Sequence, residues 1–158
     1  EFKYGNTLDS VHKIYLSAIL DLCDRRPVAY VIGDSNNNAL VFETFDKAVK
    51  ANPGAHPIFH SDRGCQFTSS KFRKHLDNLN IIQSFSAKGH PYDNAVIECF
   101  FKYLKKEEVN RRSYSSFDDL NLSLFQYING FYNSFSPHSH NNGLSPNDFE
   151  QCYFLNFC

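Results

Sequence analysis

Two carboxylates and two lysines are the residues of this chain whose types and spacing could do chemistry together. Asp62 ends a short apolar segment, and Glu98 lies one turn into a strongly amphipathic segment. Lys102 and Lys105 follow Glu98 at i+4 and i+7, so all three side chains are expected on about the same side of one helix. A carboxylate can hold a hard cation through oxygen while lysines neutralise phosphates, and this combination suits chemistry at a phosphodiester.

The same acids also have a simpler interpretation. A chain with 17 acidic residues contains many Asp and Glu pairs at any chosen separation, so the spacing alone is weak evidence. Glu98 and Lys102 also form an ordinary surface pair, worth about 0.3–0.5 kcal/mol. Residue chemistry by itself therefore favours a solvated surface over a metal site.

Strands and helices must position these residues, and their pattern is readable. Apolar runs before and after the charged turn at 24–27 predict an antiparallel hairpin, with residues 2–4 as the remains of an earlier strand. From there strands and helices alternate, which predicts an α/β fold with a mixed sheet covered by helices. The expected strands are 14–22, 28–33, 57–60 and 81–85, and the expected helices follow Asn36–Asn38, Ser69, Asp93–Asn94, Ser116 and Ser145.

Composition limits the class of protein. The 158 residues suit one domain, which we expect over 1–150 with a tail at 151–158, and the net charge of −1 argues against a generally basic nucleic-acid binder. Five scattered cysteines without a C-x-x-C pair indicate reduced thiols, and no membrane span or signal peptide is visible, so a cytoplasmic location is expected. A chain that starts at Glu1 and has no Met is expected to be a fragment or a processed form.

Three sequence blocks are far more specific than the acids alone. They are YLSAILDLCDRR at 15–26, HSDRGCQF at 60–67 and KGHPYDNAVIECFFKYLKKE at 88–107. They resemble the catalytic core of OrfB-type insertion-sequence transposases, members of the retroviral-integrase superfamily with a catalytic Asp, Asp and Glu. The 35 residues between Asp62 and Glu98 match the hallmark spacing of that family. The likeness continues through 131–133 and 144–146 and so covers nearly the whole chain.

The resemblance implies a fold, a reaction and partners. The fold is that of ribonuclease H, a mixed five-stranded sheet flanked by helices. The reaction is metal-dependent cleavage and transfer of DNA strands, with transposon ends and target DNA as partners, a homo-oligomer as the active form and association with the nucleoid. Asp62 and Glu98 become the second and third ligands of two Mg²⁺ or Mn²⁺ ions. The residues expected to contact DNA are Lys102, Lys105, Lys106, Lys88 and Arg63.

Two departures from the family pattern affect the site. The first catalytic Asp belongs to an Asp-x-Thr context, and residues 1–5 resemble the stretch directly after that Asp, so the acid itself is expected upstream of Glu1. The first strand is therefore expected to be truncated and the fragment inactive. Asp21 matches a position that is not catalytic, and it is expected to accept hydrogen bonds at a strand end or to pair with Arg25 or Arg26. Ser136 stands where the family has Arg before Pro-His.

Other interpretations remain open. The chain could be a non-catalytic remnant that binds DNA or other transposase subunits, or a ribonuclease H-like nuclease that cleaves without joining strands. His56 and His60, with Cys65 nearby, could suggest zinc, but no second ligand pair completes a tetrahedral set. His60 is instead expected to position the Asp62 segment. Asp93 and Asn94 are expected to cap the helix that carries Glu98.

Overall fold

The described residues form five strands. The structure is a computed structural model, and it describes residues 1–5, 11–87, 89 and 91–157. The strands β1 (Phe2–Tyr4), β2 (His12–Leu20) and β3 (Pro27–Gly33) form an antiparallel sheet in the order β1-β2-β3, which confirms the predicted hairpin. The strands β4 (Ile58–Ser61) and β5 (Ile82–Phe85) pair in parallel.

The sequence predicts one five-stranded sheet, but the five described strands are not all joined by hydrogen bonds into one sheet. Within the described residues the strands form two sheets, of three and two strands. The reason is the shortness of β1, whose three residues pair only with His12–Ile14 of β2. The rest of β2 pairs with β3 along one edge, and no described strand lies between its other edge and β4.

Helices begin where local capping chemistry places them. Asn37 accepts a hydrogen bond from the backbone N–H of Leu40 and starts α1 (Asn38–Ala51). Ser69 and Ser116 make equivalent bonds at the starts of their helices, as their side chains predict. The remaining bounds are α2 (Cys65–Thr68), α3 (Ser70–Asn78), α4 (Ala95–Glu107), α5 (Phe117–Phe125) and α6 (Pro146–Phe157). None of the helices in the described part of the chain combines the length and apolarity needed to cross a bilayer.

The helix expected after Ser116 changes from α-helix to π-helix in the middle. After α5 the backbone continues as a π-helix over Gln126–Tyr132. In this π-helix Asn129 donates one hydrogen bond to the Tyr30 hydroxyl of β3, at 2.7 Å, and another to the Phe125 carbonyl, at 3.1 Å. Through Asn129 the π-helix that follows α5 is thus bonded to β3 of the sheet.

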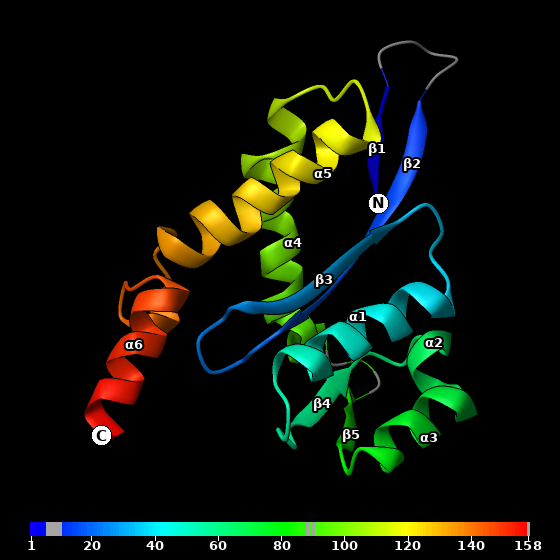
Figure 1. Ribbon diagram of the computed structural model, residues 1–158, viewed down its shortest axis with the longest axis vertical. Helices are drawn as coiled ribbons and strands as arrows, with labels where there is room; N and C mark the ends of the chain where they lie inside the picture. The colour runs from blue at the N-terminus through cyan, green and yellow to red at the C-terminus, as the bar shows by residue number, and fades with distance from the viewer. Residues whose placement is uncertain (6–10, 88, 90, 158) are drawn as a thin grey trace.

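The three-stranded sheet has helices on both faces (Figure 1). Alternate residues of β2 point to opposite sides, as a strand requires. Ile14 and its even-numbered neighbours pack with α4, α5 and the π-helix, whereas Ile19 packs with α1 and α3. The first core is centred on Phe100, Leu104, Leu120, Leu124 and Ile128, and the second on Phe45, Phe72 and Leu76.

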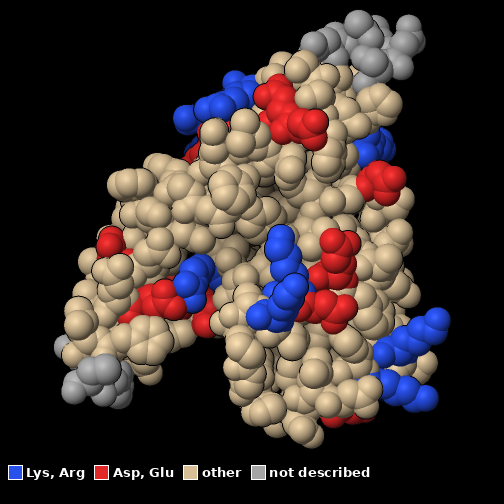
Figure 2. All heavy atoms as spheres, viewed as in Figure 1, with Lys and Arg blue, Asp and Glu red and all other residues tan. Residues whose placement is uncertain are grey.

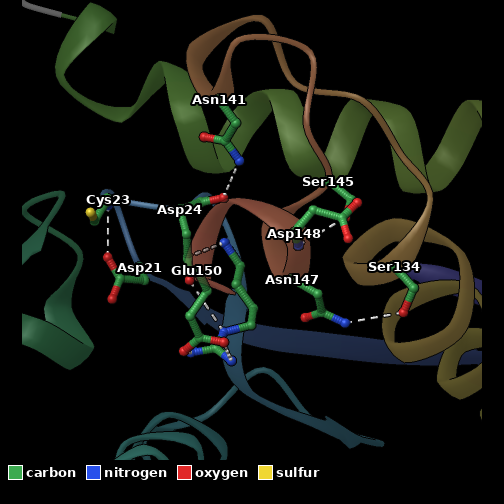
Figure 3. Close-up of polar contacts among 10 residues, drawn as sticks. Asp21, Cys23, Asp24, Ser134, Asn141, Ser145, Asn147, Asp148 and Glu150 are labelled. Atoms are coloured by element: carbon green, nitrogen blue, oxygen red, sulfur yellow. Dashed lines mark hydrogen bonds and ion pairs between the residues drawn. The ribbon is translucent and has the colours of Figure 1, made fainter. Parts of the chain in front are cut away.

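The turn between β2 and β3 is fastened to the C-terminal segment (Figure 3). Asn141 is fully buried and donates to the Asp24 carbonyl at 2.7 Å. The Arg26 guanidinium forms two hydrogen bonds to the Glu150 carboxylate of α6, at 2.8 and 2.6 Å, and lies 3.5 Å from Asp24. We call Asp24, Arg26, Asn141 and Glu150 the hairpin clamp. The clamp attaches the first part of α6 to the hairpin turn, and α6 runs unbroken across residues 150 and 151. The predicted division into a domain over 1–150 and a tail over 151–158 stays a prediction.

Candidate active site

Asp62 follows the last residue of β4 and is exposed. Its Oδ1 accepts a hydrogen bond from the Gly64 backbone N–H at 2.8 Å, which fixes the carboxylate in a tight turn. A Cβ built on Gly64 would lie only 2.9 Å from that same oxygen, so a larger residue would displace the carboxylate. Within the described residues its other oxygen, Oδ2, has no partner and remains available to a ligand.

Glu98 occupies the first turn of α4 and is also exposed. Within the described part of the chain its carboxylate makes no hydrogen bond or ion pair, including with Lys102. The opposite face of the helix is anchored by Phe100 and Leu104, which are 1% and 0% exposed. The sequence-predicted surface pair between Glu98 and Lys102 is therefore not formed, and the acid is free to meet a ligand.

The ends of β4 and β5 are joined around Ser86, which is buried. Its backbone N–H donates to the Ser61 carbonyl at 3.0 Å, and its hydroxyl lies 3.2 Å from Nε2 of His60. His60 also contacts the Ser84 hydroxyl through Nδ1, at 3.0 Å. These contacts agree with the prediction that His60 positions the segment of Asp62, and they identify Ser86 as a second residue that does so.

The start of α4 is tied to the same place by Asp93. This residue lies in a 3₁₀ turn, Pro91–Asn94, and its Oδ2 accepts a hydrogen bond from the Ala87 N–H at 2.9 Å. The prediction that Asp93 and Asn94 cap α4 is wrong. Asn94 occupies the N-cap position without a side-chain bond, because its backbone is not in the extended conformation that aims such a side chain at the helix.

A continuous path therefore connects the two predicted ligands. It runs from Ser61, next to Asp62, through Ser86 and Ala87 to Asp93, five residues before Glu98. The carboxyl ends of parallel strands are where folds of this kind bind ligands, and both acids belong to segments at that end. Neither acid is buried or closed in a salt bridge within the described residues, which leaves both accessible from solvent.

The carboxylates of Asp62 and Glu98 are the type of ligand that a hard divalent cation prefers, but two of them do not complete a site. Mg²⁺ and Mn²⁺ prefer carboxylate oxygens, and both acids offer oxygens without a protein partner in the described residues. No group of three or more His, Cys, Asp or Glu side chains with metal-binding geometry occurs among those residues. Each of the two carboxylates suits the implied metal ions in kind, and the described residues contain no group of three that could hold an ion.

The basic residues predicted to meet DNA divide into two kinds. Lys102, Lys105 and Lys106 are exposed along α4, with Lys105 Nζ 5.9 Å from the Phe2 ring centre. Arg63 instead donates from Nε to the Ser86 carbonyl at 3.2 Å, so part of its guanidinium supports the strand ends. Lys88 lies outside the described residues. Contact of these side chains with phosphate stays a prediction.

Asp21 has the structural role that its position predicts. Its Oδ1 accepts a hydrogen bond from the Cys23 N–H at 2.7 Å, inside the hairpin turn (Figure 3). Of the two expected roles, Asp21 therefore accepts hydrogen bonds and does not pair with either arginine, because Arg26 pairs with Asp24 and Glu150 and Arg25 contacts His140. A side chain used to shape this turn is not placed beside Asp62.

Charge on the surface is mixed, as the net charge of −1 suggests. Figure 2 shows small groups of basic and acidic side chains separated by uncharged surface, with no continuous basic area on the face in view. DNA contact on this domain would therefore depend on local lysines.

Comparisons with known proteins agree with this architecture. Models described as "Integrase core domain" match residues 2–91 and 79–146. The transposase for insertion sequence element IS904 of Lactococcus lactis subsp. lactis (strain IL1403) is 34% identical over 139 residues, 87% of this chain and 55% of that protein. A Lactococcus lactis subsp. lactis protein named "ATP-dependent protease" is 55% identical over 94 residues, 60% of this chain and 30% of that protein. The chain thus spans about half or less of each relative's length.

A solved structure supports the fold independently of sequence. The catalytic core domain of BIV integrase superposes with a TM-score of 0.63 over 92% of this chain and 91% of that one, at 14% identity. Identity this low makes the likeness one of fold alone. It confirms the predicted α/β, ribonuclease H-like class.

Proposed function

The chain belongs to the integrase core domain family, and we propose that it is the catalytic core of an insertion-sequence transposase that cleaves and joins DNA strands. The observation that carries this proposal is the pair of exposed acids, Asp62 and Glu98, on segments joined at the ends of β4 and β5. A carboxylate without a protein partner at this end of an α/β sheet is placed to hold a ligand rather than to stabilise the fold.

Asp62 and Glu98 would hold Mg²⁺ or Mn²⁺, two ions in the complete site. The bound ions would stabilise the attacking and leaving oxygens of a phosphodiester during strand cleavage and strand transfer. The role of the chain is to fix its two carboxylates, Asp62 through the Gly64 N–H and Glu98 through the anchored helix α4. Lys102 and Lys105, with Lys106, Lys88 and Arg63, would neutralise phosphates of transposon ends and target DNA.

The third carboxylate is proposed to lie on a longer first strand, upstream of Glu1. Two observations support this. The described residues contain no three-ligand group, and β2 beyond Ile14 has an edge with no described strand beside it. A strand that continued β1 along that edge would run between β2 and β4, towards Asp62. Residues 1–158 alone are then expected to have little or no activity.

The proposal is tested with labelled transposon-end duplexes, a target DNA and Mn²⁺. A longer product of the same reading frame that carries an upstream Asp-x-Thr should cleave and join strands, and Asp62→Asn or Glu98→Gln should each reduce both steps by more than about a hundredfold. Cleavage without joining would favour the nuclease alternative. A stop codon or unrelated sequence upstream would favour the non-catalytic remnant. Substantial Asp62-dependent turnover by residues 1–158 would refute the proposal that a required third carboxylate lies upstream of Glu1.

The lysines of α4 can be tested separately through the salt dependence of DNA binding. Each lysine that contacts a phosphate contributes about 0.9 to the slope of log K against log salt. Lys102→Gln and Lys105→Gln should each lower the slope by about that amount. Lys50→Gln is the matched control, because Lys50 is exposed in the last turn of α1, on the other face of the sheet. Equal effects of all three substitutions would contradict the assignment.

A homo-oligomer is the proposed active form, acting in the cytoplasm where the nucleoid is. What supports self-association is a set of exposed apolar side chains on α5, the π-helix and the turn after it, namely Leu122, Phe125, Phe131 and Phe135, which are 45–75% exposed. Exposed apolar groups clustered on one element commonly mark an interaction surface.

A further inference from the structure

Asp93 neither caps α4 nor is assigned to the metal site, yet its carboxylate makes a hydrogen bond to the Ala87 N–H. We propose that Asp93 is a positioning residue, which sets where Glu98 stands relative to Asp62 through its hydrogen bond to Ala87. The inference rests on the proposed function, because it assigns a purpose to Asp93 only if the two acids share a metal ion.

The first half of the argument is that the end of β5 is fixed to the segment of Asp62. Three groups of Ser86 take part: its N–H and hydroxyl contact residues of β4, and its carbonyl accepts from Arg63 at 3.2 Å. Ser86 is 7% exposed, so these bonds are shielded from competing water. Because Ala87 directly follows Ser86, these bonds also hold its backbone in place relative to the segment of Asp62.

The second half is that α4 is tied to Ala87 through Asp93. The bond from Ala87 N–H to Asp93 Oδ2 is 2.9 Å long and closes the six-residue step between them. Within the described residues no other hydrogen bond joins β5 and Ser86–Ala87 to the segment from Pro91 to Glu98. Among the hydrogen bonds of the described residues, this one alone ties the helix start to the end of β5, while Ile97 of the same turn packs against the first core.

The position of Glu98 should depend on the bond between Asp93 and Ala87, because Glu98 lies in the first turn of α4. The first N–H groups of a helix lack partners within it, and Asn94 adds no side-chain bond. The apolar anchors Phe100 and Leu104 lie further along and keep the rest of α4 in the core. Loss of the Asp93 carboxylate is thus expected to loosen the turn that carries Glu98 while the domain stays folded.

The test measures Mn²⁺ affinity from the signal of free Mn²⁺ in electron paramagnetic resonance, using residues 1–158 and a double-mutant cycle. Groups that orient metal ligands typically change affinity tenfold or more. Asp93→Ala should weaken Mn²⁺ binding roughly tenfold when Glu98 is present and have little effect in the Glu98→Gln background, because Asp93 acts through Glu98. Asp93→Asn retains an acceptor oxygen and should stay close to the parent chain.

Asp119→Ala is the matched control. Asp119 makes the same kind of bond at the start of α5, a helix that carries neither acid, where its Oδ2 accepts from the Ser115 N–H at 3.0 Å. It should leave Mn²⁺ affinity unchanged, and circular dichroism should show every variant folded. Equal weakening by Asp93→Ala in both backgrounds would overturn the positioning role, since it would reflect only the lost charge. Failure of Glu98→Gln itself to weaken binding would instead overturn the proposed function.

Discussion

Two acidic regions of this domain are built in opposite ways. In the hairpin clamp, Asp24 is buried, and the Arg26 guanidinium lies against it and against Glu150. By contrast, Asp62, directly after β4, and Glu98, in the first turn of α4, are exposed and carry no ion pair within the described residues. Carboxylates matched by cations from within the chain stabilise the fold, whereas carboxylates left without them are available for an external cation. The two regions should therefore respond oppositely to substitution and to metal.

The largest effect on stability is expected at Arg26. Arg26→Ala would leave Asp24, whose side chain is 7% exposed, without its cation and release α6 from the turn. Removing one partner of a buried pair costs about 3 kcal/mol, measured by urea unfolding. Lys13→Ala is the control, since its pair with Glu1 is 59% and 41% exposed and is worth less than about 0.5 kcal/mol. Similar losses from both variants would remove the distinction between clamp and surface.

A smaller loss is expected at Asn141. This side chain is 0% exposed and satisfies the Asp24 carbonyl, so Asn141→Ala leaves a buried acceptor unpaired and a small cavity. We expect about 2 kcal/mol less stability. Asn142→Ala, at the exposed neighbouring position, should change stability less, although its left-handed backbone adds some strain. If Asn141→Ala left the free energy of unfolding unchanged, Asn141 would not contribute to the stability of the hairpin clamp.

A pH effect of smaller size is expected beside the clamp. Burial, with Arg25 and His140 nearby, lowers the pKa of His138 below its ordinary value of 6.5. The folded state therefore disfavours protonated His138. Its contribution is fully present above about pH 6.5 and is lost as the pH falls through the lowered pKa. His138→Gln should flatten this loss in unfolding curves taken at about pH 5 and pH 8. A parent chain that gains stability towards pH 5 relative to the variant would contradict the sign.

The smallest effect on stability is expected at the two free acids. Asp62→Asn and Glu98→Gln should each change the free energy of unfolding by less than about 0.5 kcal/mol, because they break no ion pair in the described residues. Mn²⁺ at ten times its dissociation constant should stabilise the parent chain by about 1.4 kcal/mol and the variants by less. A thermal melt with and without Mn²⁺ checks both statements. A variant destabilised as much as Arg26→Ala would mean that these acids are structural.

How far the sequence predicts this molecule depends on how local each interaction is. The bonds of Asn37, Ser69 and Ser116 reach N–H groups three residues along, so residue type alone predicts those helix starts. The pair between Arg26 and Glu150 spans 124 residues, and no local pattern points to it.

The candidate site divides in the same way. Its acids were predicted, since Asp62 and Glu98 stand in recognisable sequence blocks. The roles of Ser86 and Asp93 were not, because each depends on how two strand ends and a helix start meet in space. Asp93 even carries the type of side chain that usually caps a helix, which is why the sequence suggested the wrong partner.

The most direct test is the position of Mn²⁺ in crystals of this chain grown with the ion and measured at its absorption edge. A single anomalous peak at about 2.1 Å from carboxylate oxygens of both Asp62 and Glu98 is the predicted result. A peak bound by only one of them, or none at the ends of β4 and β5 while both side chains are well ordered, would contradict the shared metal site.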